Sequence, residues 1–169
     1  EGKDYSNLKV ATFAGGCFWC TEAAFERING VVDVISGYTG GKEQYPTYEE
    51  VGREMTTHTE GIQIYYDENV VSFETLLDVL FVAHDPTTLN RQGPDRGPQY
   101  RSGIYYHNET QKEAIDKTIA YLTERKVFRN PIVTEVAPYD EFWTAEKYHQ
   151  DYYEHNPQNP YVAKVSKPK

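Results

Sequence analysis

The chain of 169 residues is poor in sulfur: it has two cysteines and a single methionine. Two cysteines are too few for the disulfide framework of a small secreted domain. No apolar run approaches the about 20 residues that span a bilayer, and no nucleotide-binding glycine fingerprint occurs. No cluster of basic residues occurs before the C-terminal tail, and the net charge is −9. These absences argue against a membrane protein, a flavin or nicotinamide enzyme, and a nucleic-acid-binding protein.

The composition that remains is that of a globular protein, with 38% hydrophobic and 25% charged residues. The length suits one domain with a sizeable core. We expect a polar N-terminal arm at residues 1–8, a single catalytic domain at 9–155, and an extended tail or linker at 156–169. No signal peptide is visible, so a cytoplasmic location is expected. The chain begins at Glu1 and not at methionine, which leaves an exported form open.

Both cysteines lie in one short stretch, residues 14–22, between a predicted strand and a predicted helix. The strand is Lys9–Ala14, and apolar residues at helical spacing predict a helix over Cys17–Asn29. Cys17 then lies in the first helical turn, where unpaired backbone N–H groups and the helix dipole favour an anion. We therefore expect a lowered pKa for Cys17 and assign its thiolate as the nucleophile.

Cys20 follows three residues later, which on a helix separates the two Cβ atoms by about 5–6 Å. A modest adjustment would let the sulfurs bond, and such a short loop suits a cycling disulfide better than a structural one. Half of a zinc site and a pair of inert buried thiols are the alternatives. Zinc is disfavoured because the chain has no second C-x-x-C and its five histidines are scattered. We predict no metal site.

The remaining chain reads as alternating strands and helices. Further strands are expected at Val31–Tyr38, Thr59–Tyr66, Arg101–His107 and Ile132–Ala137. A helix is expected from Phe73 to His84 after a Ser72 cap, another after Asn108, and short ones at Tyr48–Arg53 and Phe142–Tyr153. His84 is expected to be a structural residue at a helix end. The order predicts an α/β, ferredoxin-like split βαβ plait: a mixed sheet with packed helices, a helix-strand extension and an irregular C-terminal region.

The segment Asp85–Gln99 contains three prolines and two glycines, too many for a helix or a central strand. Loops of this length inside a compact domain are usually functional or disordered. Because firm elements flank it on both sides, we interpret it as a loop that contributes to a site.

Four blocks of sequence, in this order, resemble the peptide methionine sulfoxide reductase A family. They are Gly-Gly-Cys-Phe-Trp-Cys at 15–20, Ser-Gly-Tyr-Thr-Gly-Gly at 36–41 with Pro-Thr-Tyr-Glu-Glu-Val at 46–51, His-Thr-Glu at 58–60, and Arg-Gln-Gly-Pro-Asp-Arg-Gly-Pro-Gln-Tyr-Arg-Ser at 91–102. The resemblance runs from about Lys9 to about Asn159. Each block alone is weak, and together they are specific. The family implies the same α/β plait and reduction of methionine-S-sulfoxide, free or within proteins.

Reduction of a sulfoxide by a thiol needs a nucleophile, an acid for the oxygen, and an apolar surface that excludes water. With Cys17 as nucleophile, the resemblance implies Glu60 as the acid, which then needs a raised pKa. Phe18 and Trp19 are expected to form the apolar wall. The alternative is that both are ordinary core residues. A solvated carboxylate at the end of a strand is the alternative for Glu60.

The resemblance also places Tyr48, Tyr100 and Asp95 around the sulfoxide oxygen. Ordinary packing is the alternative for the tyrosines, and an Asx turn or an ion pair is the alternative for Asp95. Many members of the family carry glycine where Cys20 stands and place resolving cysteines near the C-terminus. This tail has none, so Cys20 is the only internal candidate for that role.

The expected cycle forms a sulfenic acid on Cys17, then a Cys17–Cys20 disulfide, which thioredoxin or dithiothreitol reduces. We expect the enzyme to be a monomer and to carry out this cycle without a bound cofactor. A general thiol–disulfide oxidoreductase would explain the C-x-x-C but leaves Glu60 and the loop Asp85–Gln99 without roles. A zinc- or peptide-binding module without catalysis is a third reading. The tail could also link to a companion reductase for the opposite epimer.

Overall fold

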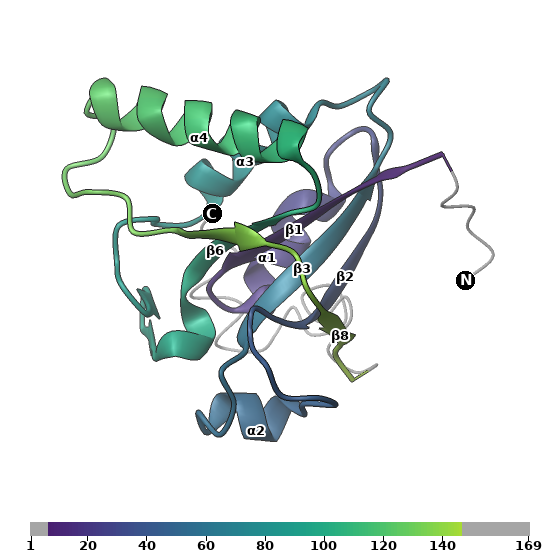
Figure 1. Ribbon diagram of the computed structural model, residues 1–169, viewed down its shortest axis with the longest axis vertical. Coiled ribbons are helices and arrows are strands. Elements are labelled where there is room, and N and C mark those ends of the chain that lie inside the picture. The colour runs from purple at the N-terminus through teal and green to yellow at the C-terminus, as the bar shows by residue number, and fades with distance from the viewer. Residues whose placement is uncertain (1–6, 147–169) are drawn as a thin grey trace.

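A six-stranded sheet forms the centre of the chain, in a computed structural model that describes residues 7–146 (Figure 1). Its strands, in spatial order, are β7 (Glu135–Pro138), β6 (Ser102–Tyr106), β1 (Lys9–Gly15), β3 (Thr59–Tyr66), β2 (Val31–Thr39) and β8 (Phe142–Thr144). Neighbouring strands are antiparallel except β6 and β7, which are parallel, so the sheet is mixed as expected.

Three helices form a continuous layer against this sheet. Helix α1 (Phe18–Glu26) packs on β2 and β3, α3 (Phe73–Ala83) packs on β1 and α1, and α4 (Glu109–Glu124) packs on β6 and α3. Apolar side chains from both layers meet in a fully buried core, which includes Phe13, Phe25, Ile62, Ile64, Leu76, Leu77, Leu80, Ile104 and Ile115. The chain is therefore an α/β protein whose helices and strands share one core.

The predicted helix caps are present. Ser72 accepts a hydrogen bond from the Thr75 N–H, and Asn108 accepts one from the Gln111 N–H. The side chain of Gln111 accepts from the N–H of His107, one residue before the cap, instead of closing a capping box on Asn108. These side chains satisfy N–H groups that a helix leaves unpaired at its start.

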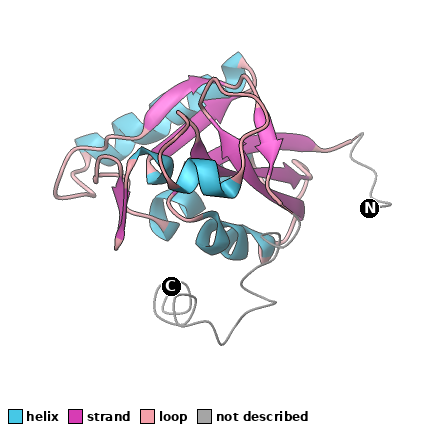
Figure 2. Cartoon of the chain, turned by 90° about the horizontal axis from the view of Figure 1, so that it is seen from below, coloured by secondary structure: helices cyan, strands magenta, loops and turns pink. Residues whose placement is uncertain are grey.

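Helix α2 (Tyr48–Gly52) stands apart from the other helices, beside the ends of the central strands (Figure 1). Figure 2, which views the chain from below, brings this helix in front of the sheet. A complete capping box between Thr47 and Glu50 starts the helix and compensates for its short length. The short turn predicted at Tyr48–Arg53 is therefore confirmed.

Three predicted elements differ from the structure. The strand expected at Ile132–Ala137 begins only at Glu135, as β7 (Glu135–Pro138), where its pairing with β6 starts. The helix expected from Cys17 begins at Phe18 and ends at Glu26, with Cys17 as its N-cap. The short helix expected from Phe142 is wrong at its start, because Phe142–Thr144 is strand β8, which pairs with β2. Backbone pairing with the edge of β2 decides the conformation there, and such a contact leaves no local sequence signal. The rest of that predicted helix, 147–153, lies outside the described residues.

The predicted loop Asp85–Gln99 is confirmed as irregular, with small elements of its own. It contains the two-residue strands β4 (Arg91–Gln92) and β5 (Asp95–Arg96) and leads into the 3-10 helix η1 (Pro98–Tyr100). The expected arm at 1–8 and tail at 156–169 fall almost entirely outside the described residues, so these boundaries stay predictions. No helix in the described part of the chain has the length and apolarity to cross a membrane.

Candidate active site

Cys17 lies where β1 passes into α1, and glycine makes the turn. Gly16 has φ +92°, and a Cβ on it would lie 2.6 Å from Cγ of Gln92 in the loop Asp85–Gln99. Only glycine fits this backbone and this close approach. Cys17 itself has extended dihedrals as the N-cap of α1, so its side chain leaves the chain at the beginning of the helix.

The two cysteines are reduced, buried and in contact. The N–H of Cys20 donates to the carbonyl oxygen of Cys17 over 3.1 Å, and the two thiols hydrogen-bond to each other. The turn at the start of α1 thus brings the two thiols together as predicted. Two sulfurs already in contact need little movement to form a disulfide.

The expected lowering of the Cys17 pKa is wrong. Burial raises the pKa of this thiol well above its usual range, and the hydrogen bond from Cys20 and the charge of Glu60 raise it further. The backbone hydrogen bond from Trp19 at the helix start acts in the opposite direction but is the smallest contribution. Loss of water therefore outweighs the helix terminus, and Cys17 rests as a neutral thiol.

Glu60 lies directly against the start of α1. Its Oε1 accepts the N–H of Phe18 over 3.0 Å, and its side chain is 1% exposed. Burial raises its pKa to about 8, with the charges of Asp95 and Cys20 adding to the effect and the Phe18 hydrogen bond opposing it. The alternative of a solvated strand-end carboxylate is therefore wrong: at neutral pH Glu60 is mostly protonated.

The second carboxyl oxygen of Glu60 is also buried. Among residues 7–146, Oε2 has no hydrogen-bond partner. An unpaired buried polar atom costs free energy, so a group that can accept a proton or a hydrogen bond from Glu60 is favoured here.

Two adjacent aromatic residues follow Cys17 and contact the same tyrosine. The ring of Phe18 stacks on Tyr48 at 6.2 Å between centroids, and Trp19 stacks on Tyr48 at 6.2 Å. Phe18 is fully buried in the core, whereas Trp19 and Tyr48 are only partly buried. Phe18 therefore does pack as a core residue, and Trp19 with Tyr48 forms the accessible part of the apolar surface.

Tyr100 and Asp95 approach the same carboxyl from the loop side. Burial raises the pKa of Tyr100, and the charges of Glu60, Asp95 and Cys17 raise it further. Asp95 in turn raises the pKa of Glu60. The structure therefore brings together all eight site residues that the sequence indicated, from β1–α1, α2, β3 and the segment of β5 and η1.

Tyr38 and Glu146 are part of this site, and sequence reasoning assigned neither a role. The buried Tyr38 hydroxyl donates to Oε1 of Glu146 over 2.8 Å, and its ring contacts Phe18 at 5.7 Å. The N–H of Tyr48 donates to Oε2 of Glu146 over 3.0 Å. Glu146 thereby joins β2 to the start of α2. Tyr38 stood inside a recognised block, whereas Glu146 lies 98 positions from Tyr48 and carried no signal.

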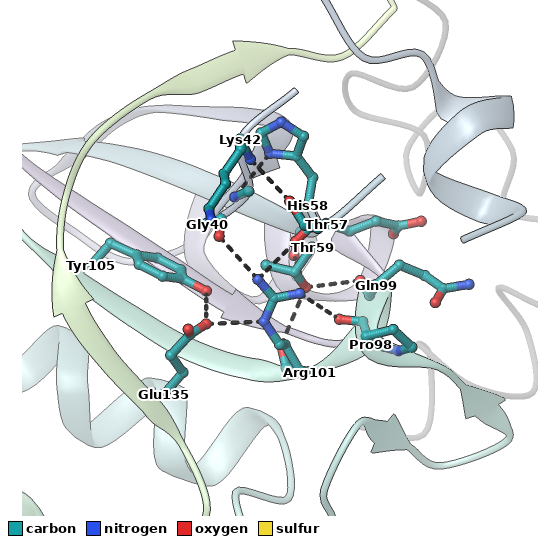
Figure 3. A network of polar contacts seen from close by, with 12 residues as sticks. Gly40, Lys42, Thr57, His58, Thr59, Pro98, Gln99, Arg101, Tyr105 and Glu135 are labelled. Atoms are coloured by element: carbon teal, nitrogen blue, oxygen red, sulfur yellow. Dashed lines mark hydrogen bonds and ion pairs between the residues drawn. The ribbon is translucent and has the colours of Figure 1, made fainter. Parts of the chain in front are cut away.

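Arg101 connects four parts of the chain next to the site (Figure 3). Its guanidinium donates to the backbone oxygens of Gly40 at 3.3 Å, Thr57 at 3.1 Å and Pro98 at 2.8 Å, and to the carboxylate of Glu135 at 2.9 Å. Two of the recognised sequence blocks, 36–41 and 91–102, therefore meet at one side chain, together with Thr57, which directly precedes a third block. The planar guanidinium suits this role because it presents several N–H donors in fixed directions.

The glycine turn beside Arg101 has no room for a side chain. Gly40 has φ +81°, and a Cβ on it would lie 2.7 Å from the Tyr105 hydroxyl and 2.9 Å from Nη2 of Arg101. The next residue, Gly41, donates its N–H to Nδ1 of His58, whose Nε2 therefore carries the proton donated to the Glu43 carbonyl. The turn before α2 is thus held against the segment that leads into Glu60.

Comparison with known proteins decides the family. The model of a family described as "Peptide methionine sulfoxide reductase" matches residues 9–169. The chain belongs to the peptide methionine sulfoxide reductase family. It is 56% identical over 165 residues to peptide methionine sulfoxide reductase MsrA 1 of Rhodopirellula baltica, covering 98% of this chain and 85% of that one. It is 50% identical to MsrA of Natronomonas pharaonis over 95% of this chain and 90% of that one.

Solved structures agree with this family membership. Mxr1 from Saccharomyces cerevisiae in reduced form matches with a TM-score of 0.84 and 37% identity, over 92% of this chain and 90% of that chain. Methionine sulfoxide reductase A of Corynebacterium diphtheriae matches with a TM-score of 0.80 and 33% identity, over 92% and 77%. The chain is a peptide-methionine (S)-S-oxide reductase, an enzyme that reduces methionine sulfoxide with thiols.

Proposed function

We propose that Cys17 is the nucleophile and Glu60 the general acid of this methionine sulfoxide reductase. The observation that carries the proposal is the hydrogen bond from the Phe18 N–H to Glu60, which holds a buried carboxyl against the residue next to Cys17. Because its pKa is raised to about 8, Glu60 has a proton to give at neutral pH. Its unpaired Oε2 supports a contact with the substrate oxygen.

In the first step the sulfur of Cys17 bonds to the sulfoxide sulfur; this bond and the sulfur–oxygen bond of the sulfoxide then break as the oxygen passes to the sulfur of Cys17. Glu60 protonates the oxygen, and the proton that Cys17 loses restores the acid. Methionine leaves, and Cys17 becomes a sulfenic acid. The step consumes no external proton, which fits a site where the thiol and the carboxyl are both neutral at rest.

Trp19, Tyr48 and the buried Phe18 behind them would hold the methyl group of the substrate and exclude water. Tyr100 would steady the oxygen by donating a hydrogen bond, since burial keeps its hydroxyl protonated. Asp95 would act by its charge, because it raises the pKa of Glu60.

In the second step Cys20 attacks the sulfenic sulfur, a disulfide forms and water leaves. The contact between the two thiols supports this role. We propose that thioredoxin then reduces the disulfide by exchange and that no bound cofactor takes part. One similar solved structure is of Mxr1 from Saccharomyces cerevisiae in complex with Trx2, with a TM-score of 0.60 and 27% identity over 90% of this chain.

Several finer features belong to the same proposal. Strands β6-β1-β3-β2, joined in the chain as β-α-β-β-α-β, support a ferredoxin-like plait at the centre of the fold. We also propose a monomer that acts in a reducing compartment such as the cytoplasm, on free or protein-bound methionine sulfoxide. No observation favours the general thiol–disulfide oxidoreductase, in which a buried neutral Glu60 would have no task.

The test is an assay of methionine-S-sulfoxide reduction, first with dithiothreitol and then with thioredoxin, thioredoxin reductase and NADPH. Cys17→Ser is expected to form no methionine with either reductant. Cys20→Ser is expected to yield about one methionine per enzyme and then to stop with thioredoxin, because the sulfenic acid is not resolved. Full turnover of Cys20→Ser with thioredoxin would remove Cys20 from the mechanism.

A further inference from the structure

Tyr45 has an unusual backbone and an unusual exposure. Its φ is +55°, in the left-handed region, and its side chain is 77% exposed. Bulky residues rarely adopt this conformation, and they keep it only where the surroundings impose it. An exposed aromatic ring held in this way contributes little to folding, which directs attention to binding.

The ring of Tyr45 lies on a second aromatic residue of the site face. It contacts Trp143 with 4.7 Å between ring centroids. Trp143 is the cross-strand partner of Tyr38 in the pairing of β2 with β8, and paired residues point to the same side of a sheet. That side is the one on which Tyr38 contacts Phe18.

The same surface continues into α2. Tyr45 lies three residues before Tyr48, whose ring stacks on Trp19. The backbone N–H of Tyr48 and the hydroxyl of Tyr38 also donate hydrogen bonds to the two carboxylate oxygens of Glu146. The pair Tyr45–Trp143 therefore lies beside the aromatic residues of the cysteine site, linked to them by the pairing of Trp143 with Tyr38 and by the short segment from Tyr45 to Tyr48.

We propose that Tyr45 and Trp143 bind an apolar or aromatic side chain that flanks the oxidised methionine in a protein substrate. The proposal rests on the proposed function, because the sulfoxide itself is placed at Cys17. Free methionine sulfoxide has no flanking residue, so it cannot use this surface. An exposed ring supported by a second ring offers apolar area and favours an aromatic neighbour.

The experiment compares three substrates that contain the S epimer: free methionine sulfoxide, and methionine sulfoxide with one glycine or one phenylalanine on each side in capped tripeptides. The wild-type enzyme is expected to show a kcat/KM about fivefold higher for the phenylalanine peptide than for the glycine peptide. Tyr45→Gly removes the ring and suits the positive φ, so it is expected to fold and to lose this ratio. Tyr45→Phe keeps the ring and is expected to retain it.

Tyr121→Ala is the matched control, because Tyr121 is an exposed tyrosine of α4 away from the site, and all three rates should stay unchanged. The inference is overturned if Tyr45→Gly keeps the peptide ratio or if the wild type treats both peptides alike. Failure of the wild type to reduce even free methionine-S-sulfoxide would instead overturn the proposed function.

Discussion

Two buried polar clusters of this chain differ in how their hydrogen bonds are satisfied. At the end of α3, His84 donates from Nδ1 to the Leu80 carbonyl at 2.6 Å, so Nε2 accepts from the Ser102 hydroxyl at 2.7 Å. Ser102 in turn accepts from Thr134 at 2.8 Å. Each member of this cluster has a partner, and its effect is to join α3, β6 and the segment before β7.

The cluster around Glu60 is equally buried but incompletely satisfied. One carboxyl oxygen has no partner among the described residues, and burial keeps the group neutral. A satisfied cluster stabilises a fold, whereas an unsatisfied one lowers stability and is retained where chemistry requires it. The two clusters should therefore respond in opposite ways to substitution.

The largest effect is expected for Glu60→Gln. The amide keeps the shape and an acceptor for the Phe18 N–H but cannot donate the acid's proton. We expect kcat to fall by about 10²–10³-fold with the fold intact, as for the loss of a general acid. Steady-state kinetics with methionine-S-sulfoxide and circular dichroism measure both. Activity near wild type would make Glu60 a bystander.

The stability of the wild type should depend on pH because of the same residue. Below about pH 4.5 Glu60 is neutral in both the folded and the unfolded protein. Between about pH 4.5 and 8 it is ionised in the unfolded protein only. The raised pKa therefore makes stability fall as pH rises through this window, by about 3–5 kcal/mol in total. Urea unfolding at pH 5 and pH 9 should show this loss in the wild type and not in Glu60→Gln. Equal losses would contradict the buried neutral carboxyl.

Arg101→Met tests a side chain that shares a feature with each cluster. Like His84 it forms hydrogen bonds to several partners, and like Glu60 it lies next to the site. Loss of its four hydrogen bonds is expected to cost about 3 kcal/mol of unfolding free energy and to lower kcat several-fold. Arg101→Lys keeps the charge but not the fork and should recover little. Arg125→Met, which removes an exposed contact with Tyr121 on α4, is the control and should change neither quantity.

Ser102→Ala is expected to have the smallest effect on activity. It leaves Nε2 of the buried His84 without its donor and should cost about 2 kcal/mol of unfolding free energy. Because the cluster takes no part in the chemistry, kcat should stay within about twofold of wild type. Thr134→Ala removes only the outer hydrogen bond and should cost about half as much. A large loss of kcat in Ser102→Ala without loss of stability would show that this cluster contributes to catalysis.

Much of the fold could be predicted because its signals are local. Alternating and helical apolar spacing located β3 and α3, and the side chains of Ser72 and Asn108 cap the helices that they were predicted to start. The conformation of residues 142–144 was predicted wrongly for a physical reason. Strand β8 forms by pairing with the edge of β2, which is distant in the sequence, and such a contact leaves no trace in neighbouring residues.

The amino-acid sequence by itself determined the chemistry: two thiols one helical turn apart, a glycine turn before them, and the blocks that mark the family. Only the tertiary structure decided the protonation states. It surrounds Cys17 and Glu60 with protein instead of water, so the thiol pKa rises where the helix start alone would lower it. It also brought Arg101 and Glu146 to their partners, since hydrogen bonds between residues 44 to 108 positions apart follow from the packing of the whole sheet.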